Sequence, residues 1–178
     1  VTSGAMINST ATSDITIMGP GATTDGLVFT AGSSINDLEI NRSTASGSVG
    51  LASGLTVVGT VFLTDGDLVL QNGTLTMNAG SRIQIQDGNF GQNGGTFDGT
   101  ASYDVDFIGG SHASGLELTG PGLNNVLVGL TASTDTVVLS DDVTINGNLD
   151  MSLGMLSLNG NNLTLDGTFD ENASAVFV

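Results

Sequence analysis

The chain has 178 residues, 18 acidic and 2 basic side chains, a formal net charge of −16 and no cysteine. Disulfides and thiolate sites are therefore excluded, and nucleic-acid binding is not expected, because it needs clustered Lys and Arg to neutralise phosphates. The chain contains no run of about 20 apolar residues, the length that spans a bilayer, so membrane insertion is not expected either.

Short alternations of apolar and polar residues recur along the chain, and this period of two marks a half-buried strand. The separators, such as Asp-Gly, Asn-Gly and Gln-Asn-Gly, are turn formers. Because the strands start six to seven residues apart, three of them would make a coil of about 20 residues. The apolar pairs are Leu55/Val57, Val61/Leu63, Leu68/Leu70 and Leu75/Met77, then Val143/Ile145, Leu149/Met151, Leu156/Leu158 and Leu163/Leu165.

The sequence also repeats on a longer scale. Residues 35–78 align without a gap with residues 123–166, at an offset of 88, and 10 of the 44 aligned positions are identical. Apolar positions stay in phase in this alignment, and the turn residues Gly59 and Gly66 meet Gly147 and Gly154. We therefore predict two tandem units, residues 1–88 and residues 89–178, and expect both to belong to a longer repetitive protein.

Two all-β architectures fit these patterns: a parallel β-solenoid and a series of antiparallel β-sandwich repeats. The very short strands, the two regular spacings and an aromatic content of only 4% favour the solenoid, whose core consists of stacked aliphatic rows. About nine coils at roughly 4.8 Å each would make a rod of some 40 Å. We expect the glycine-rich residues 89–99 to loosen this solenoid or change its cross-section.

The second unit carries a recognisable order of elements. Residues 122–128 read GLNNVLV, residues 136–147 read TVVLSDDVTING, and residues 148–166 read NLDMSLGMLSLNGNNLTLD. In this order they resemble the repeats of very large secreted surface proteins of Bacteroidetes. The resemblance implies an extracellular adhesin or filament protein, secreted by the type IX system and of the gliding-motility kind. Passengers of autotransporter adhesins are similar in composition and stay an alternative.

Calcium is the one candidate cofactor. Asp65 and Asp67 flank a turn glycine, and Asp141 and Asp142 are adjacent at a second predicted turn. Carboxylates and backbone carbonyls at turns supply the hard oxygen ligands that Ca²⁺ prefers. Neither an EF-hand loop nor a glycine-rich nonapeptide calcium repeat is present, however, and the alternative is that these residues simply form turns.

Enzymatic activity is not expected. His112, in the segment GGSHASG, is predicted to be a solvated loop residue, because no nucleophile motif surrounds Ser111 or Ser114. Asp104 and Asp106 share one face of a predicted strand, where paired carboxylates could hydrolyse glycans. We expect a solvated face there instead.

We therefore predict a structural and adhesive repeat protein that forms a stalk or filament shaft on a bacterial cell surface. Solenoid units contact only their neighbours, so the expected partners are neighbouring repeats or copies of the chain, end to end, and surface glycans. The alternative function is a glycan-binding or polysaccharide-degrading module. A glycan-binding surface would need exposed aromatic side chains or an Asp/Asn groove, and Tyr103 and Phe107 are the aromatic candidates.

Overall fold

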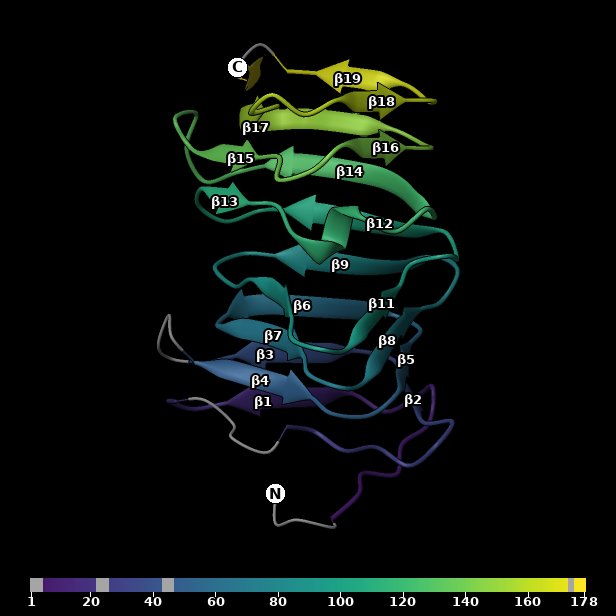
Figure 1. The fold of residues 1–178 in the computed structure, drawn as a ribbon. Helices are drawn as coiled ribbons and strands as arrows, with labels where there is room; N and C mark the ends of the chain where they lie inside the picture. Colours follow the sequence, from purple (N-terminus) through teal and green to yellow (C-terminus); the bar gives the residue numbers. More distant parts are fainter. Residues whose placement is uncertain (1–4, 22–25, 43–46, 173–174) are drawn as a thin grey trace.

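The computed structural model is an all-β solenoid of about seven turns (Figure 1). It describes residues 5–21, 26–42, 47–172 and 175–178. All strand pairs among these residues are parallel, and successive turns are spaced by about 22 residues. The predicted parallel solenoid is confirmed, and the antiparallel alternative is wrong, because each strand pairs with its equivalent one turn later rather than with its neighbour in sequence.

One long sheet runs from the first turn to the last. One row of inward residues, one from each strand, crosses this sheet from turn to turn. Each residue of the row pairs with the next: Ile15, Leu38, Val61, Ile83, Val105, Val126, Leu149 and Phe169. The strands of this sheet are β1 (Ile15–Met18), β3 (Leu38–Asn41), β6 (Thr60–Asp65), β9 (Ser81–Ile85), β12 (Tyr103–Phe107), β14 (Leu123–Gly129), β17 (Leu149–Ser157) and β19 (Phe169–Glu171).

The expected nine coils are therefore too many. Each turn is slightly longer than 20 residues, and before residue 15 the described chain forms only an isolated bridge, between Ile7 and Phe29. At roughly 4.8 Å per strand, the stack from β1 to β19 is about 34 Å long.

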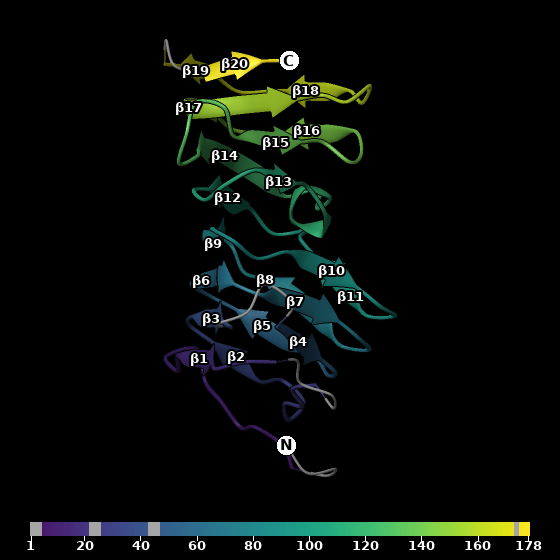
Figure 2. The ribbon, with the colours of Figure 1, turned by 90° about the vertical axis from the view of Figure 1, so that its left-hand side faces the viewer.

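The other two faces are each divided into a lower and an upper part (Figure 2). In the lower part each turn contributes three strands, as predicted. The lower sheets are β4 (Ser48–Leu51), β7 (Asp67–Leu70) and β10 (Phe90–Gln92), and β2 (Ser34–Ile35), β5 (Leu55–Val57), β8 (Thr74–Met77) and β11 (Thr96–Asp98). The upper part contains β13 (His112–Ala113), β15 (Thr136–Val138) and β20 (Ala175–Phe177), which join the second half of β17, and the pair β16 (Val143–Ile145) and β18 (Leu163–Leu165).

The break between the lower and upper sheets was predicted at residues 89–99, but it lies one turn later. Residues 89–99 form β10 and β11, which pair in register with β7 and β8 of the turn below. Their glycines let the corner pass close to that turn: a Cβ at Gly95 would lie 2.6 Å from the carbonyl oxygen of Gly73. The regular pattern stops only at the short 3₁₀ helix η1 (Leu116–Leu118), which lies between β11 and β16.

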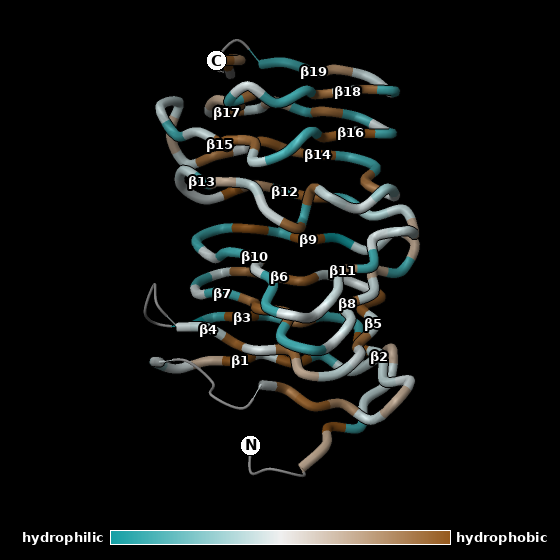
Figure 3. Tube along the Cα trace, viewed as in Figure 1, coloured by the Kyte–Doolittle hydropathy of each residue, from teal (hydrophilic) through white to brown (hydrophobic). Residues whose placement is uncertain are grey.

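Aliphatic rows fill the interior, and Figure 3 shows the alternation of apolar and polar residues along the long sheet. Residues matched by the offset of 88 lie on one row, four turns apart: Leu38 corresponds to Val126, and Val61 to Leu149. The inward positions predicted from the repeat are therefore confirmed for this row. The long sheet also continues across residue 88, since β9 pairs with β12, and the division into two units stays a prediction.

The corners that lead into the long sheet are stacked in the same way in both units. Thr60 N–H donates to Asp37 Oδ1 over 2.7 Å, and Asn148 N–H donates to Asn125 Oδ1 over 2.9 Å. The residue before each N–H donor is a glycine, and the two glycines have equivalent surroundings. A Cβ at Gly59 would lie 2.7 Å from an Asn36 side-chain oxygen, and one at Gly147 would lie 2.6 Å from Asn124 and Asn125 side-chain oxygens.

Candidate functional site

A groove of about 260 Å³ lies on the outer surface of the long sheet. It crosses β9, β12, β14 and β17, which lie side by side. Strand alternation directs Asp104 and Asp106 outward on either side of the buried Val105. The groove is lined by Arg82, Asp104, Asp106, Asn125, Val126, Leu127, Asn148 and Asp150.

Arg82 holds the two aspartates of β12 together. Its Nη1 lies 2.8 Å from Asp106 Oδ2, and its Nη2 lies 3.6 Å from Asp104 Oδ2. Burial raises the pKa of Asp106; the Arg82 charge opposes this effect and the Asp104 charge adds to it. Asp104 and Asp106 share the outward face, as predicted, but the expectation that this face is solvated is wrong for Asp106, which is only 7% exposed.

Asp104 also ties β12 to the next turn. Its Oδ1 accepts hydrogen bonds from the Asn125 N–H (3.1 Å), the Asn125 Nδ2 (2.9 Å) and the Asn124 Nδ2 (3.1 Å). Arg82 is a residue of this site that was not predicted from the sequence. A coil length of 22 residues would have predicted this contact, since Arg82 pairs directly with Asp104 one turn later.

The aromatic candidates for glycan binding are not on this surface. Tyr103 and Phe107 are inward residues of β12, and each is at most 1% exposed. That part of the prediction is wrong because the alternation that turns Asp104 and Asp106 outward turns both rings inward. Phe62 of β6 does lie on the outward row and is half-buried; it pairs with Gln84, which pairs with Asp106.

The calcium candidates lie at two separate corners of the solenoid. Asp65 and Asp67 lie where β6 meets β7, whereas Asp141 and Asp142 precede β16. Within the described ranges there is no group of three or more His, Asp or Glu side chains that could hold a metal ion. Calcium binding stays a prediction.

Two of these four carboxylates bind an asparagine of the following turn. Asp67 Oδ1 accepts hydrogen bonds from the N–H (3.1 Å) and Nδ2 (2.8 Å) of Asn89. Asp142 Oδ1 accepts the equivalent pair from Asn162, over 2.7 and 3.1 Å. The backbone N–H of Asn162, and then its side chain, lower the pKa of Asp142. These contacts join successive turns.

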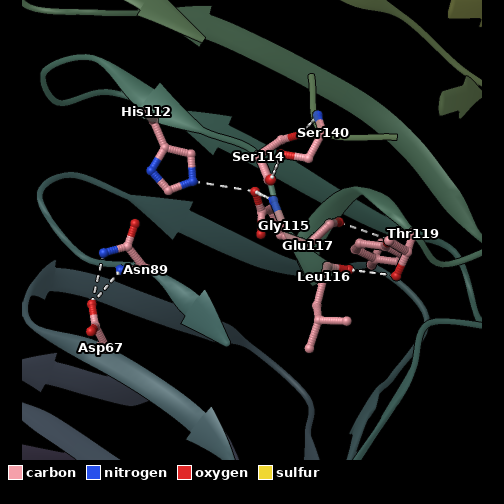
Figure 4. Close-up of polar contacts among 10 residues, drawn as sticks. Asp67, Asn89, His112, Ser114, Gly115, Leu116, Glu117, Thr119 and Ser140 are labelled. Carbon is pink, nitrogen blue, oxygen red and sulfur yellow. Dashed lines mark hydrogen bonds and ion pairs between the residues drawn. The ribbon is translucent and has the colours of Figure 1, made fainter. Parts of the chain in front are cut away.

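His112 belongs to a second polar cluster, at η1 (Figure 4). Its side chain is 9% exposed and its Nε2 lies 3.3 Å from Oε1 of Glu117, which is fully buried. The prediction of a solvated loop histidine is therefore wrong. Its ring also packs on Phe107, with the ring centroids 5.3 Å apart.

The serines near His112 make other contacts. Ser114 Oγ accepts a hydrogen bond from the Ser140 N–H over 3.0 Å, and Ser111 Oγ accepts one from the Thr136 N–H over 3.1 Å. Both serines therefore join neighbouring turns.

The Tyr103 hydroxyl completes the cluster from β12. It donates to the carbonyl oxygen of Glu117 over 2.9 Å and accepts from the Gly120 N–H over 3.1 Å. Burial raises its pKa, and the Gly120 hydrogen bond opposes part of this rise. Beside it, a notch of about 330 Å³ is lined by Leu118, Thr119, Gly120, Pro121, Asp142 and Thr144.

No protein-family model, curated protein or solved structure matches this chain. Across the described part of the chain, no helix has the length and apolar character needed to cross a membrane.

Proposed function

We propose that this chain is a structural and adhesive segment of an extracellular stalk or filament shaft on a bacterial cell surface. The observation that carries this proposal is the long sheet, whose strands pair in parallel from β1 to β19 across the interruption at η1. Such a stack is a rod whose length grows with the number of turns. The net charge of −16 keeps rods soluble and disfavours side-by-side association.

The partners in this proposal are neighbouring repeats or further copies, stacked end to end. The last described turn supports this, because it exposes a group of large apolar side chains. Phe169 and Phe177 lie in ring contact, with centroids 5.2 Å apart, and the exposed members of the group are Phe169, Val176, Phe177 and Val178. Contact with another turn would remove this apolar surface from water.

The cellular setting is also part of the proposal: a large secreted surface protein of the Bacteroidetes type, exported by type IX secretion, with a role in adhesion or gliding. Its support is the order of the segments at residues 122–128, 136–147 and 148–166, which resembles repeats of such proteins. The absence of lysine suits it, since few sites are left for trypsin-like proteases outside the cell.

Electron microscopy of intact source cells, labelled with an antibody raised against this chain, tests the proposal. We expect label along thin surface fibres at regular intervals. Label scattered over the envelope or in the medium, without fibres, would contradict a shaft role. Cells lacking the gene provide the control for antibody specificity.

A further inference from the structure

The groove on the long sheet combines apolar and hydrogen-bonding side chains in one outward row. Asp106 pairs with Leu127, and Leu127 pairs with Asp150, so the apolar side chain lies between two carboxylates. Gln84 and the half-buried Phe62 continue the row below Asp106. Neighbouring members are one strand spacing apart, about 4.8 Å.

Part of the hydrogen-bonding capacity of the groove is already used within the protein. Asp104 is bound by the amides of the next turn, and Asp106 by Arg82. Asp150 is exposed, and no contact of its side chain is found among the described residues. Arg82 keeps 47% of its side chain exposed at the other end of the groove. A ligand therefore meets an acceptor at Asp150 and donors at Arg82.

This combination selects the class of ligand. A metal ion is disfavoured, because the groove carboxylates of Asp104, Asp106 and Asp150 do not form a group that could hold one, and neither do other described residues. A cationic segment would meet the Arg82 guanidinium, and an anionic one would meet three carboxylates. Hydroxyl groups donate and accept at once, so they suit Arg82 and Asp150 together, and the C–H face of a sugar suits Leu127.

We propose that this groove binds a neutral glycan chain laid along the solenoid axis, with Arg82 and Asp150 as hydrogen-bonding contacts and Leu127 as the apolar contact. The strand spacing is close to the length of one sugar unit in an extended chain, so successive sugars meet successive turns. The site lies on the side of the rod, and it does not depend on the shaft role or on end-to-end stacking.

Binding of the whole chain to immobilised neutral oligosaccharides (β-glucan, xylan and mannan fragments) tests the site, with poly-lysine as the cationic comparison. We expect binding to at least one neutral glycan that persists at high salt, since the contacts are not between net charges. Asp150→Ala should weaken it about tenfold, in line with a hydrogen bond to a charged group. Leu127→Asp, which places a charge on the apolar contact, should abolish it.

Asp87→Ala is the matched control, because it removes one exposed carboxylate at a corner outside the groove; glycan binding should not change. Asp150 is also exposed, so thermal unfolding should show that Asp150→Ala folds normally. Absence of binding to every neutral glycan would overturn the proposal. So would binding to poly-lysine alone that salt removes, or glycan binding that Asp150→Ala and Leu127→Asp leave intact.

Discussion

The regular turns below residue 100 and the interrupted turn at residues 103–122 achieve the same stacking by different means. In the regular turns, three short strands direct aliphatic side chains inward, such as Leu63, Leu70 and Leu75. In the interrupted turn, η1 replaces the third strand, and Glu117 is buried with His112 beside it. The long sheet nevertheless continues through both regions.

This difference shows which part of the solenoid tolerates irregularity. Two faces can lose strand pairing for a turn, provided that the long sheet keeps its register and polar groups inside find partners. Most of them do: the Tyr103 hydroxyl makes two hydrogen bonds, and Glu117 Oε1 accepts one from the Gly115 N–H over 2.7 Å. Buried oxygens that lack a hydrogen-bond partner include Glu117 Oε2 here and Ser81 Oγ in β9 of a regular turn. Because leaving a carboxylate oxygen unsatisfied costs more than leaving a hydroxyl unsatisfied, we expect the interrupted turn to be the weaker of the two regions.

The largest effect should come from the regular core. Leu75→Ala removes a fully buried side chain between close-packed turns, and we expect it to lower the free energy of unfolding by about 2–5 kcal/mol. Leu118→Ala should cost less, because Leu118 borders the notch beside η1 and its loss leaves no closed cavity. Equilibrium unfolding in urea measures both. An equal or larger loss for Leu118→Ala would contradict the comparison.

An intermediate effect is expected at the hydroxyl that anchors η1. Tyr103→Phe leaves the Gly120 N–H without its hydrogen-bond acceptor, and we expect a loss of about 1–3 kcal/mol in the free energy of unfolding. Hydrogen exchange should become faster around Gly120, while exchange in β7 and β8 stays unchanged. Gln84→Ala, on the outer face of β9, is the control and should change stability by no more than about 0.5 kcal/mol. Equal acceleration in both regions would argue against a local anchor.

The interrupted turn should also respond to alkaline pH. Burial raises the pKa of Tyr103, whereas in the unfolded chain the phenol titrates at about 10. The raised pKa therefore contributes stability that is complete below about pH 10 and declines as the pH rises further. Tyr103 is the single tyrosine, and tryptophan is absent, so tyrosinate absorbance reports this residue alone. Titration of the folded protein at the ordinary pKa would contradict the buried hydroxyl.

The smallest effect is expected at the exposed contacts between turns. Asn162→Ala removes the side-chain donor to Asp142 but keeps the backbone N–H, which contributes more to the lowered pKa. We expect the pKa of Asp142 to rise only part of the way to its usual value, with little change in overall stability. Carboxyl chemical shifts followed against pH by NMR measure it. A pKa that is unchanged in Asn162→Ala would show that the side-chain hydrogen bond is not formed in solution.

The sequence by itself determined most of the strands and the inward positions of the long sheet, and it favoured the parallel solenoid over the antiparallel alternative. It did not show that the predicted strands that begin at Leu149 and Leu156 form the single strand β17. Alternation such as Leu68/Leu70 and turn formers such as Asp65-Gly66 are local signals, and the offset of 88 relates residues such as Leu38 and Val126 that lie on one row. These features follow from the period of the apolar residues and from the turn-forming residues, and both can be read from a short segment of sequence.

Only the tertiary structure decided which polar groups meet. Arg82 contacts Asp104 and Asp106 because one turn takes about 22 residues there. An error of one residue in that length would place an inward residue, Tyr103 or Val105, opposite Arg82 instead. The burial of His112 against Glu117 likewise depends on where η1 replaces a strand. Coil length is the sum of three strands and three corners, so it is a property of the whole turn and not of any local motif.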